Sequence, residues 1–575
     1  MSTQPLVSVK NLTVDFQTAD GVVRAVNNIS FDIPAGKTIG IVGESGSGKS
    51  VTSLAMMGLL QKPAAQIPSG EIWFDGKDLL KMPEDELRNM RGDKMTMIFQ
   101  EPMTSLNPVF KVGDQIAEVL RLHKKLNKKD AWEKAVDLMN QVGIPNPKLK
   151  AHAYPHEMSG GQKQRVMIAM AIACDPKLLI ADEPTTALDV TIQKQVLDLM
   201  LNLQQEYKMS ILFITHDLGV IGDLADDVVV MYRSNLVEKN HVSTIFEKAD
   251  HPYTKGLIAC RPRLGANPKR LLTVSDYMTE DGKELKVTAE RLQVFDKETT
   301  PKPDTEVLLE IKNLETSFPI KGGLLGRTVD QFKAVNNVSF KIQKGKTFGL
   351  VGESGCGKTT LGRTILRLIE PSAGEIIYKG KDITHVYGEE LRHMRKKMQI
   401  IFQDPYSSLN PRMTIADILM EPLVIHKVGA NRAERLDMAK QLVEKVELKV
   451  AQMSRYPHEF SGGQRQRICI ARALMLRPEF VVCDESVSAL DVSIQAQVLN
   501  LLMDLQQEFG LTYIFISHDL GVVNFISDDV AVMNKGQIIE MGKANQIYRH
   551  PQQEYTKTLL AAIPHGIPKL QPTSV

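Results

Sequence analysis

Gly43-Glu-Ser-Gly-Ser-Gly-Lys-Ser50 decides the fold, because it matches the phosphate-binding loop pattern G-x-x-x-x-G-K-[ST]. Its glycines let the backbone curl until successive N–H groups face one phosphate chain. Lys49 adds a positive charge for the β- and γ-phosphates, and the Ser50 hydroxyl is a ligand for Mg²⁺. The apolar run 38–42 predicts a buried strand, and residues 51–60 predict a helix whose positive end faces the phosphates.

The pattern occurs a second time, as Gly352-Glu-Ser-Gly-Cys-Gly-Lys-Thr359, again after an apolar run. This repetition argues against the alternative that either copy is an ordinary glycine-rich turn. Other residues recur in register, Phe16 as Phe318 and Gln100 as Gln403, so we predict a tandem duplication of a whole domain rather than a solenoid. The predicted phosphate contacts are Gly43, Ser45, Gly46, Gly48, Lys49, Ser50 and Val51 in copy one and Gly352, Ser354, Gly355, Gly357, Lys358, Thr359 and Thr360 in copy two.

Composition indicates a soluble globular protein with more than one domain, since 43% of the 575 residues are hydrophobic and 24% are charged. The 70 basic and 68 acidic residues nearly cancel, so the overall charge does not favour nucleic acid as a partner. The five cysteines form no C-x-x-C pair, which argues against a zinc site or a disulfide framework and fits a reducing cytoplasm. We expect neither a secretory signal nor a membrane span.

Strands that alternate with helices in each copy predict a parallel sheet covered by helices on both faces. The first domain is predicted over 5–264 and the second over 307–563, with a flexible tail at 564–575. Residues 265–306 have the prolines and modest charge that are typical of a linker, and the apolar piece Leu271–Val274 within them is a candidate for docking.

Two carboxylates follow an apolar run in each copy, Asp182 and Glu183 after residues 178–181 and Asp484 and Glu485 in copy two. Parallel sheets bind ligands at the carboxyl ends of their strands. We therefore predict that Asp182 and Asp484 hold Mg²⁺ and that Glu183 and Glu485 polarise the attacking water. A helix N-cap is the alternative, and it accounts for one acid of each pair but not for both.

Met158-Ser-Gly-Gly-Gln162 and Phe460-Ser-Gly-Gly-Gln464 each precede a strong helix pattern, whose N-terminus can face an anion. Ala-Leu-Asp and then Thr-His-Asp or Ser-His-Asp follow in both copies. With the phosphate loops and the Asp-Glu pairs in this order, the chain resembles the ATP-binding cassette ATPases twice, over almost its whole length. The resemblance implies an α/β fold with two P-loop NTPase cassettes, each having a parallel-sheet core, an antiparallel β subdomain and an α-helical subdomain.

The resemblance also implies ATP and Mg²⁺ as cofactors and an intramolecular head-to-tail cassette dimer. Lys49 would then share a nucleotide with Ser461 and Gly463, and Lys358 with Ser159 and Gly161. His216 and His518 would contact the γ-phosphate. Gln100 and Gln403 would sense Mg²⁺ and the lytic water, while their loops face a membrane partner. Phe16 and Phe318 stand where the family stacks an aromatic ring on adenine, and a phenylalanine of a strand core is the alternative for both.

Further stretches resemble the dipeptide, oligopeptide and nickel importers, and the chain looks like both ATPases of such an importer fused into one. They are residues 99–108 with 402–411, Tyr154-Pro-His-Glu157 with Tyr456-Pro-His-Glu459, the insert 321–327, and His251-Pro-Tyr-Thr254 with residues 550–556. Loop packing is the alternative for the first two pairs. Some relatives carry an iron–sulfur cluster after the His-Pro-Tyr stretch, but only Cys260 lies there, so we expect no cluster.

The leading interpretation is the ATP-hydrolysing motor of an importer on the cytoplasmic face of the bacterial inner membrane. Two permease subunits, and through them a solute-binding protein, would be its partners, and no nucleic acid is expected. A tandem cassette ATPase that acts on ribosomes is the alternative, although such proteins usually have a long charged helical linker. A DNA-repair cassette would need cysteine pairs that this chain lacks. Peptides, a glutathione-like solute and a metal chelate all remain open as cargo.

Overall fold

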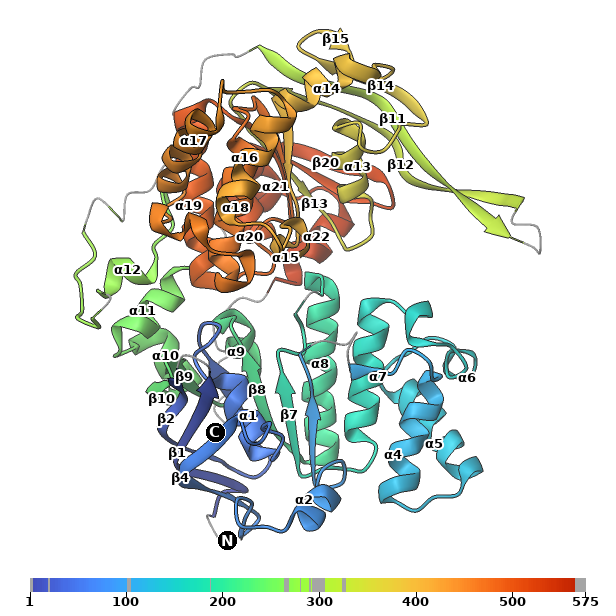
Figure 1. Cartoon of the computed structure of the whole chain (residues 1–575). Coiled ribbons are helices and arrows are strands. Elements are labelled where there is room, and N and C mark those ends of the chain that lie inside the picture. The colour runs from blue at the N-terminus through green and yellow to red at the C-terminus, as the bar shows by residue number, and fades with distance from the viewer. Residues whose placement is uncertain are drawn as a thin grey trace.

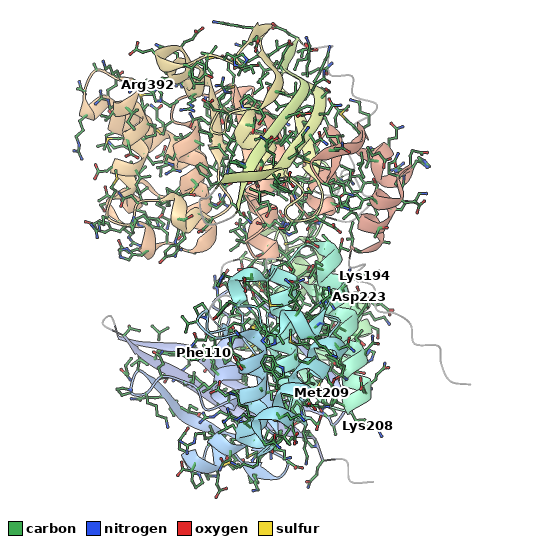
Figure 2. All side chains as sticks on the ribbon, turned by 90° about the vertical axis from the view of Figure 1, so that its right-hand side faces the viewer. Phe110, Lys194, Lys208, Met209, Asp223 and Arg392 are labelled. Atoms are coloured by element: carbon green, nitrogen blue, oxygen red, sulfur yellow. The ribbon has the colours of Figure 1, made fainter. Side chains whose placement is uncertain are left out.

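The structure is a computed structural model that describes residues 4–18, 21–100, 105–186, 188–262, 268–279, 281–288, 291, 306–322 and 327–563. Its two copies lie one above the other, with the helical part of each copy opposite the β part of the other (Figure 1). Lys194 lies at the junction, where its Nζ donates a hydrogen bond to the Ala561 carbonyl at 2.8 Å (Figure 2). The predicted duplication of an α/β domain is confirmed, since each copy has one six-stranded and one four-stranded sheet.

Each copy is built around a six-stranded sheet whose strands are parallel except for one antiparallel edge strand. The central strands are buried on both faces, which explains their unbroken apolar sequences. Copy one has the order β10(Asn235–His241), β9(Asp227–Tyr232), β3(Thr38–Val42), β8(Ser210–Thr215), β7(Leu178–Asp182) and β6(Met95–Ile98). Copy two has the order β16(Met398–Ile401), β17(Phe480–Asp484), β18(Thr512–Ile516), β13(Thr347–Val351), β19(Asp529–Asn534) and β20(Gln537–Lys543).

A second, four-stranded antiparallel sheet packs with the phosphate-loop helix of each copy. In copy two the hairpin strands run to Gly322 and from Arg327, and they project from the body (Figure 1). Residues 323–326 of the predicted insert 321–327 lie outside the described residues. The strands are β2(Gly21–Ile33), β1(Val7–Thr18), β4(Ala65–Phe74) and β5(Lys77–Asp78) in copy one and β12(Arg327–Gln343), β11(Val307–Gly322), β14(Ala373–Tyr378) and β15(Lys381–Asp382) in copy two.

In the chain, a group of helices lies between β6 and β7 of copy one and between β16 and β17 of copy two. Further helices pack against the main sheets (Figure 1). Copy one has α1(Lys49–Met56), α2(Glu84–Met90), α4(Val112–His123), α5(Lys128–Gln141), α6(Pro147–Lys150), α7(Gly160–Ile172), α8(Val190–Tyr207), α9(Leu218–Leu224), α10(Val242–Lys248) and α11(Pro252–Ala259). Copy two has α13(Lys358–Ile365), α14(Gly388–Lys397), α15(Pro405–Ser408), α16(Ile415–Ile425), α17(Arg432–Lys445), α18(Gly462–Leu474), α19(Val492–Phe509), α20(Leu520–Ile526), α21(Ala544–Arg549) and α22(Glu554–Ala561).

The loop helix differs in its bounds from the predicted 51–60. It begins at Lys49, and it ends at Met56 because Gly58 takes the left-handed conformation, with φ +62°, that commonly terminates helices. Among the described residues, no helix has both the length and the apolarity that crossing a membrane requires. All five cysteines are buried free thiols.

The apolar piece of the predicted linker docks onto copy two. The backbone N–H of Leu271 donates to Asn500 Oδ1 at 3.0 Å, and Asn500 Nδ2 donates back to the Leu271 carbonyl at 2.9 Å. Arg270 forms an ion pair with Asp504 of the same helix, α19, at 2.9 Å. The short helix α12(Val274–Tyr277) follows. The predicted tail 564–575 and linker residues 292–305 lie outside the described residues, and the domain boundaries stay predictions.

Candidate nucleotide site

The phosphate loop of each copy turns sharply before its helix and holds its lysine in a buried position. Gly48 has φ +100°, and a Cβ there would lie only 2.4 Å from the Ala25 carbonyl oxygen, so the turn requires glycine. Lys49 Nζ donates to the carbonyls of Gly43 and Glu44 at 2.8 and 2.9 Å. Copy two repeats these contacts, from Lys358 to Gly352 and Glu353 at 2.7 and 2.8 Å.

A hydroxyl and a carboxylate meet beside each lysine, as a Mg²⁺ site requires. Ser50 Oγ donates to Asp182 Oδ1 at 3.0 Å, and Thr359 Oγ1 donates to Asp484 Oδ1 at 2.7 Å. The other oxygen of Asp484 is buried and accepts no hydrogen bond, although Arg363 lies 3.6 Å away. Mg²⁺ in nucleotide sites takes one or two carboxylates together with substrate phosphates, so this oxygen set fits the ion.

Asp182→Asn should stabilise the nucleotide-free, magnesium-free protein above pH 6. Burial, opposed by the Ser50 hydrogen bond, raises the pKa of Asp182 to about 6 from 3.8. A raised carboxyl pKa means that the folded state loses stability as pH climbs from about 4 to 6 and keeps that loss above. This difference between the folded and the ordinary pKa of Asp182 lowers the free energy of unfolding by at most roughly 3 kcal/mol. We expect a higher Tm for Asp182→Asn at pH 7.5 and equal Tm values at pH 4.

The matched control is Asp484→Asn. Burial raises the pKa of Asp484 as well, but the nearby Arg363 opposes this rise, so the gain in Tm should be smaller. A Tm difference between Asp182→Asn and wild type that does not depend on pH would contradict the prediction.

A second carboxylate in each copy lies beside the predicted glutamine and histidine, and in copy one beside Thr186 as well. Glu183 Oε2 accepts from Gln100 Nε2 at 2.9 Å and from Thr186 Oγ1 at 3.0 Å, and His216 Nδ1 lies 3.3 Å from its other oxygen. The backbone of Glu183 has φ +46°, a conformation that such residues rarely adopt and that often marks a functional site.

Copy two builds the same cluster around Glu485, whose φ is +48°. Gln403 Nε2 donates to Glu485 Oε2 at 2.8 Å, and His518 Nδ1 lies 3.4 Å from the same oxygen. The predicted Lys, Ser or Thr, Asp, Glu, Gln and His therefore come together in both copies.

Charge pairing keeps both glutamates ionised. Burial by itself would raise the pKa of Glu183, but the hydrogen bond and charge of His216, with the charge of Lys49, outweigh it and lower that pKa to about 2. In turn, burial would lower the pKa of His216, but Glu183 raises it. An ionised carboxylate at this place can accept a hydrogen bond from a water molecule aimed at a phosphate bound on the lysine.

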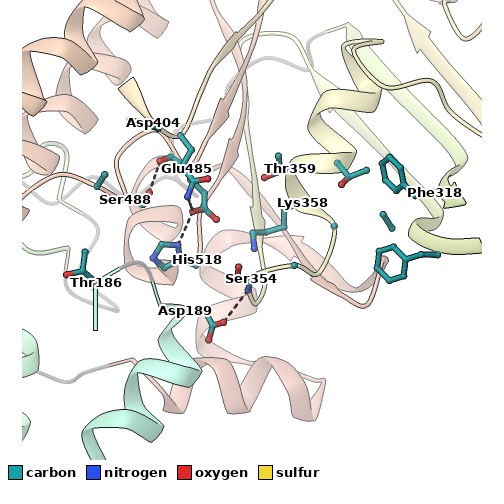
Figure 3. A pocket seen from close by; sticks show the side chains of 17 residues that line it. Thr186, Asp189, Phe318, Ser354, Lys358, Thr359, Asp404, Glu485, Ser488 and His518 are labelled. Atoms are coloured by element: carbon teal, nitrogen blue, oxygen red, sulfur yellow. Dashed lines mark hydrogen bonds and ion pairs between the residues drawn. The ribbon is translucent and has the colours of Figure 1, made fainter. Parts of the chain in front are cut away.

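Copy two has a pocket that copy one helps to form (Figure 3). The backbone N–H of Ser354 donates to Asp189 Oδ2 at 3.4 Å, and in the other direction the N–H of Ser45 donates to Asp491 Oδ2 at 2.9 Å. Ser159 begins the Ser-Gly-Gly-Gln stretch of copy one, the signature stretch, as Ser461 does in copy two. Ser159 is not among the residues that line this pocket, and its Oγ instead caps its own helix α7. The pocket lining includes Lys358, Thr359, Glu485 and His518 of copy two and Thr186 and Asp189 of copy one.

The aromatic end of the pocket differs between the copies. Phe318 lines it and pairs across the hairpin with Phe332, which lines it too. These side chains are 40% and 56% exposed, which leaves two rings free for a ligand. In copy one Phe16 is partly buried, and the residue that pairs with it is Val23. The sequence reasoning missed Phe332, although aligning the two copies pairs it with Val23.

Phe332→Val should weaken ATP binding at copy two, and Val23→Phe should strengthen it at copy one. An aromatic pair contributes about 0.5–1.5 kcal/mol beyond its buried area, so we expect changes of about two- to tenfold. ATP titrations would measure each site with the other disabled by Lys49→Ala or Lys358→Ala. Unchanged affinity in both variants would contradict an adenine contact for residue 332.

These features define an ATP-binding cassette ATPase. The chain belongs to the ABC transporter family, because the family described as ABC transporter matches residues 26–186 and 335–488, one stretch in each copy. A second family, the oligopeptide/dipeptide transporter C-terminal region, matches residues 237–281 and 539–573. Members of the first family bind and hydrolyse ATP, and this chain is an ATPase of that kind.

Similar proteins extend over the whole duplication. The glutathione import ATP-binding protein GsiA of Pectobacterium atrosepticum is 48% identical over 568 residues, which are 98% of this chain and 90% of that protein. The protein of the same name in Escherichia coli K12 is 47% identical over 578 residues with the same coverage. A solved cassette dimer in a post-hydrolysis state with ADP and Pi is 28% identical, with a TM-score of 0.38, and covers 41% of this chain and 99% of its own.

Proposed function

We propose that this chain is the ATP-hydrolysing motor of a membrane importer for peptides or a similar small solute, with glutathione among the candidates. One observation carries the proposal: a region described for oligopeptide and dipeptide transporters follows each cassette. The glutathione import relatives that match 98% of the chain support it. The order of cassette, extension, cassette and extension fits both ATPases of one importer joined in a single chain.

In this function the two copies share their nucleotides. Each ATP would lie between the phosphate loop of one copy and the Ser-Gly-Gly-Gln stretch of the other. Ser50, Asp182 and Gln100 would hold Mg²⁺ in copy one, and Thr359, Asp484 and Gln403 in copy two. Glu183 and Glu485 would polarise the attacking water, and His216 and His518 would contact the γ-phosphate. Phe16 and Phe318 would stack on adenine.

The partners would be two permease subunits and, through them, a solute-binding protein, with the chain held peripherally on the cytoplasmic face of the bacterial inner membrane. Residues 105–111, the described part of the segment after Gln100, offer them a surface. Val109 and Phe110 are 70% and 55% exposed on it (Figure 2). The buried Gln115 stiffens this loop, because its Nε2 donates to the carbonyls of Asn107 and Phe110, both at 3.0 Å. A rigid loop with exposed apolar side chains suits a contact with another protein.

The test is ATP-driven uptake of a labelled peptide by membrane vesicles that contain the chain together with its candidate permease subunits. We expect uptake with the wild type and not in excess chelator. Phe110→Asp should lower both uptake and co-purification with the permeases, while ATP hydrolysis by the isolated chain stays normal. Leu149→Asp, at another exposed apolar position of the helical part, is the control and should change neither. Co-purification with ribosomes and none with the permeases would favour the alternative function.

A further inference from the structure

A tyrosine from each C-terminal extension holds the start of the phosphate loop in the same copy. The backbone N–H of Glu44 donates to the Tyr253 hydroxyl at 3.0 Å, and that of Glu353 donates to the Tyr555 hydroxyl at 3.2 Å. These extensions lie about 200 residues after the loops that they contact. The contact occurs independently in both copies, which argues against a chance approach of one side chain.

The two extensions aim their tyrosines with the same device although their sequences differ. Glu238, on the edge strand β10, accepts hydrogen bonds from the N–H groups of Asp250 and His251 at 2.9 and 3.1 Å. His251 Nδ1 then caps α11 by accepting from the N–H of Tyr253 at 3.2 Å. This series of contacts fixes the direction in which the first turn of α11 presents its tyrosine.

In copy two the capping carboxylate is Glu540, on the edge strand β20. It accepts from the N–H groups of Gln552 and Gln553 at 2.8 and 3.2 Å and so places the first turn of α22. The turn there reads His-Pro-Gln-Gln-Glu-Tyr instead of His-Pro-Tyr, yet the tyrosine reaches the equivalent loop position.

The tyrosine contact differs from two other contacts of the loop, those of Lys49 and of Asp491. Lys49 Nζ donates to the carbonyls of Gly43 and Glu44, and it must leave them in order to bind a phosphate. Asp491 holds the Ser45 N–H from the other copy, so that contact depends on how the copies meet. Tyr253 is fully buried, its partner Glu44 belongs to the same copy, and it can keep its hydrogen bond when nucleotide enters.

We propose that Tyr253 and Tyr555 are positioning residues that keep the start of each phosphate loop in place, so that its N–H groups face the phosphates. The oligopeptide-type extension thereby sets the nucleotide affinity of the cassette that it follows. This inference rests on the proposed nucleotide site and gives the extension a role in that site. The loss of one neutral hydrogen bond should weaken binding about three- to tenfold.

The test measures MgATP affinity in the full chain with one site active. In the Lys358→Ala background, Tyr253→Phe should raise the Kd for MgATP at copy one by about three- to tenfold. In the Lys49→Ala background, Tyr555→Phe should do the same at copy two, and since Tyr555 is only half-buried, this variant keeps the test open if Tyr253→Phe folds poorly. In otherwise wild-type protein, each change should raise KM more than it lowers kcat.

Tyr513→Phe is the matched control, because Tyr513 is a buried tyrosine whose hydroxyl donates to the Leu502 carbonyl at 3.1 Å, away from either loop. It should lower Tm to a similar degree and leave the Kd unchanged. Equal Kd changes in the control and the test variants, or no change in the test variants, would overturn the inference. If the Lys358→Ala and Lys49→Ala backgrounds themselves bound no MgATP, the proposed nucleotide sites would fail instead.

Discussion

Glu183→Gln combined with Glu485→Gln should leave ATP binding intact and slow hydrolysis about 10²–10⁴-fold, the usual effect of removing a general base. Gln keeps the shape and can still accept the hydrogen bond from Thr186, which is 3.0 Å from Glu183 in the wild type. It loses the negative charge that would orient the attacking water. Phosphate release and equilibrium ATP binding measure the two effects separately. Each single variant should retain turnover at the other site.

Glu206→Gln is the control for this experiment, because Glu206 is an exposed carboxylate of α8 that contacts Gln141 at 2.8 Å. It should hydrolyse ATP at the wild-type rate. A double variant of Glu183 and Glu485 that turned over as fast as this control would remove both glutamates from the mechanism.

The histidines affect how strong a base each of these glutamates is. Burial would raise the pKa of Glu183, but the neighbouring His216 outweighs this effect and lowers that pKa to about 2. A carboxylate with so low a pKa is a weak base near pH 7. If His216 turns toward a γ-phosphate, Glu183 loses this partner and the pKa of its buried carboxyl rises, which makes it a better base.

Much of the site was predictable because its signals are local. The phosphate loops and the Asp-Glu pairs each lie within a few residues of a strand end, and parallel strands bring their carboxyl ends together at one edge. The apolar piece at Leu271 was recognisable as a docking segment, but its partner Asn500 was not, since nothing in either stretch encodes the other. The site contacts of Tyr253 and Phe332 were not predicted for the same reason. Tertiary structure determines which residues they contact, and periodicity in the sequence predicts only local secondary structure.

A series of contacts connects the Ser-Gly-Gly-Gln stretch of each copy to the phosphate loop of the other. In copy two, Gly463 of the signature stretch packs so closely on α19 that a Cβ would lie 2.4 Å from Ile494 Cγ2. Asp491 directly precedes the same helix without capping it through its side chain, and its carboxylate accepts from the Ser45 N–H of copy one. The signature stretch of copy two is therefore connected through one helix end to the phosphate loop of copy one. Gly161 packs on Ile192 in the same way, and Asp189 reaches Ser354.

Ser461→Arg should therefore disable the nucleotide held by Lys49, and Ser159→Arg the one held by Lys358. The loss of an electrostatic contact of this kind raises the barrier by about 3–4 kcal/mol, or roughly 10²–10³-fold in rate. Lys49→Ala with Ser461→Arg damages one site twice and should keep single-turnover hydrolysis at the other. Lys49→Ala with Ser159→Arg damages both sites and should abolish it. If the first double variant were the less active one, each Ser-Gly-Gly-Gln stretch would serve its own copy. If the two double variants were equally inactive, the shared-site arrangement would also be wrong.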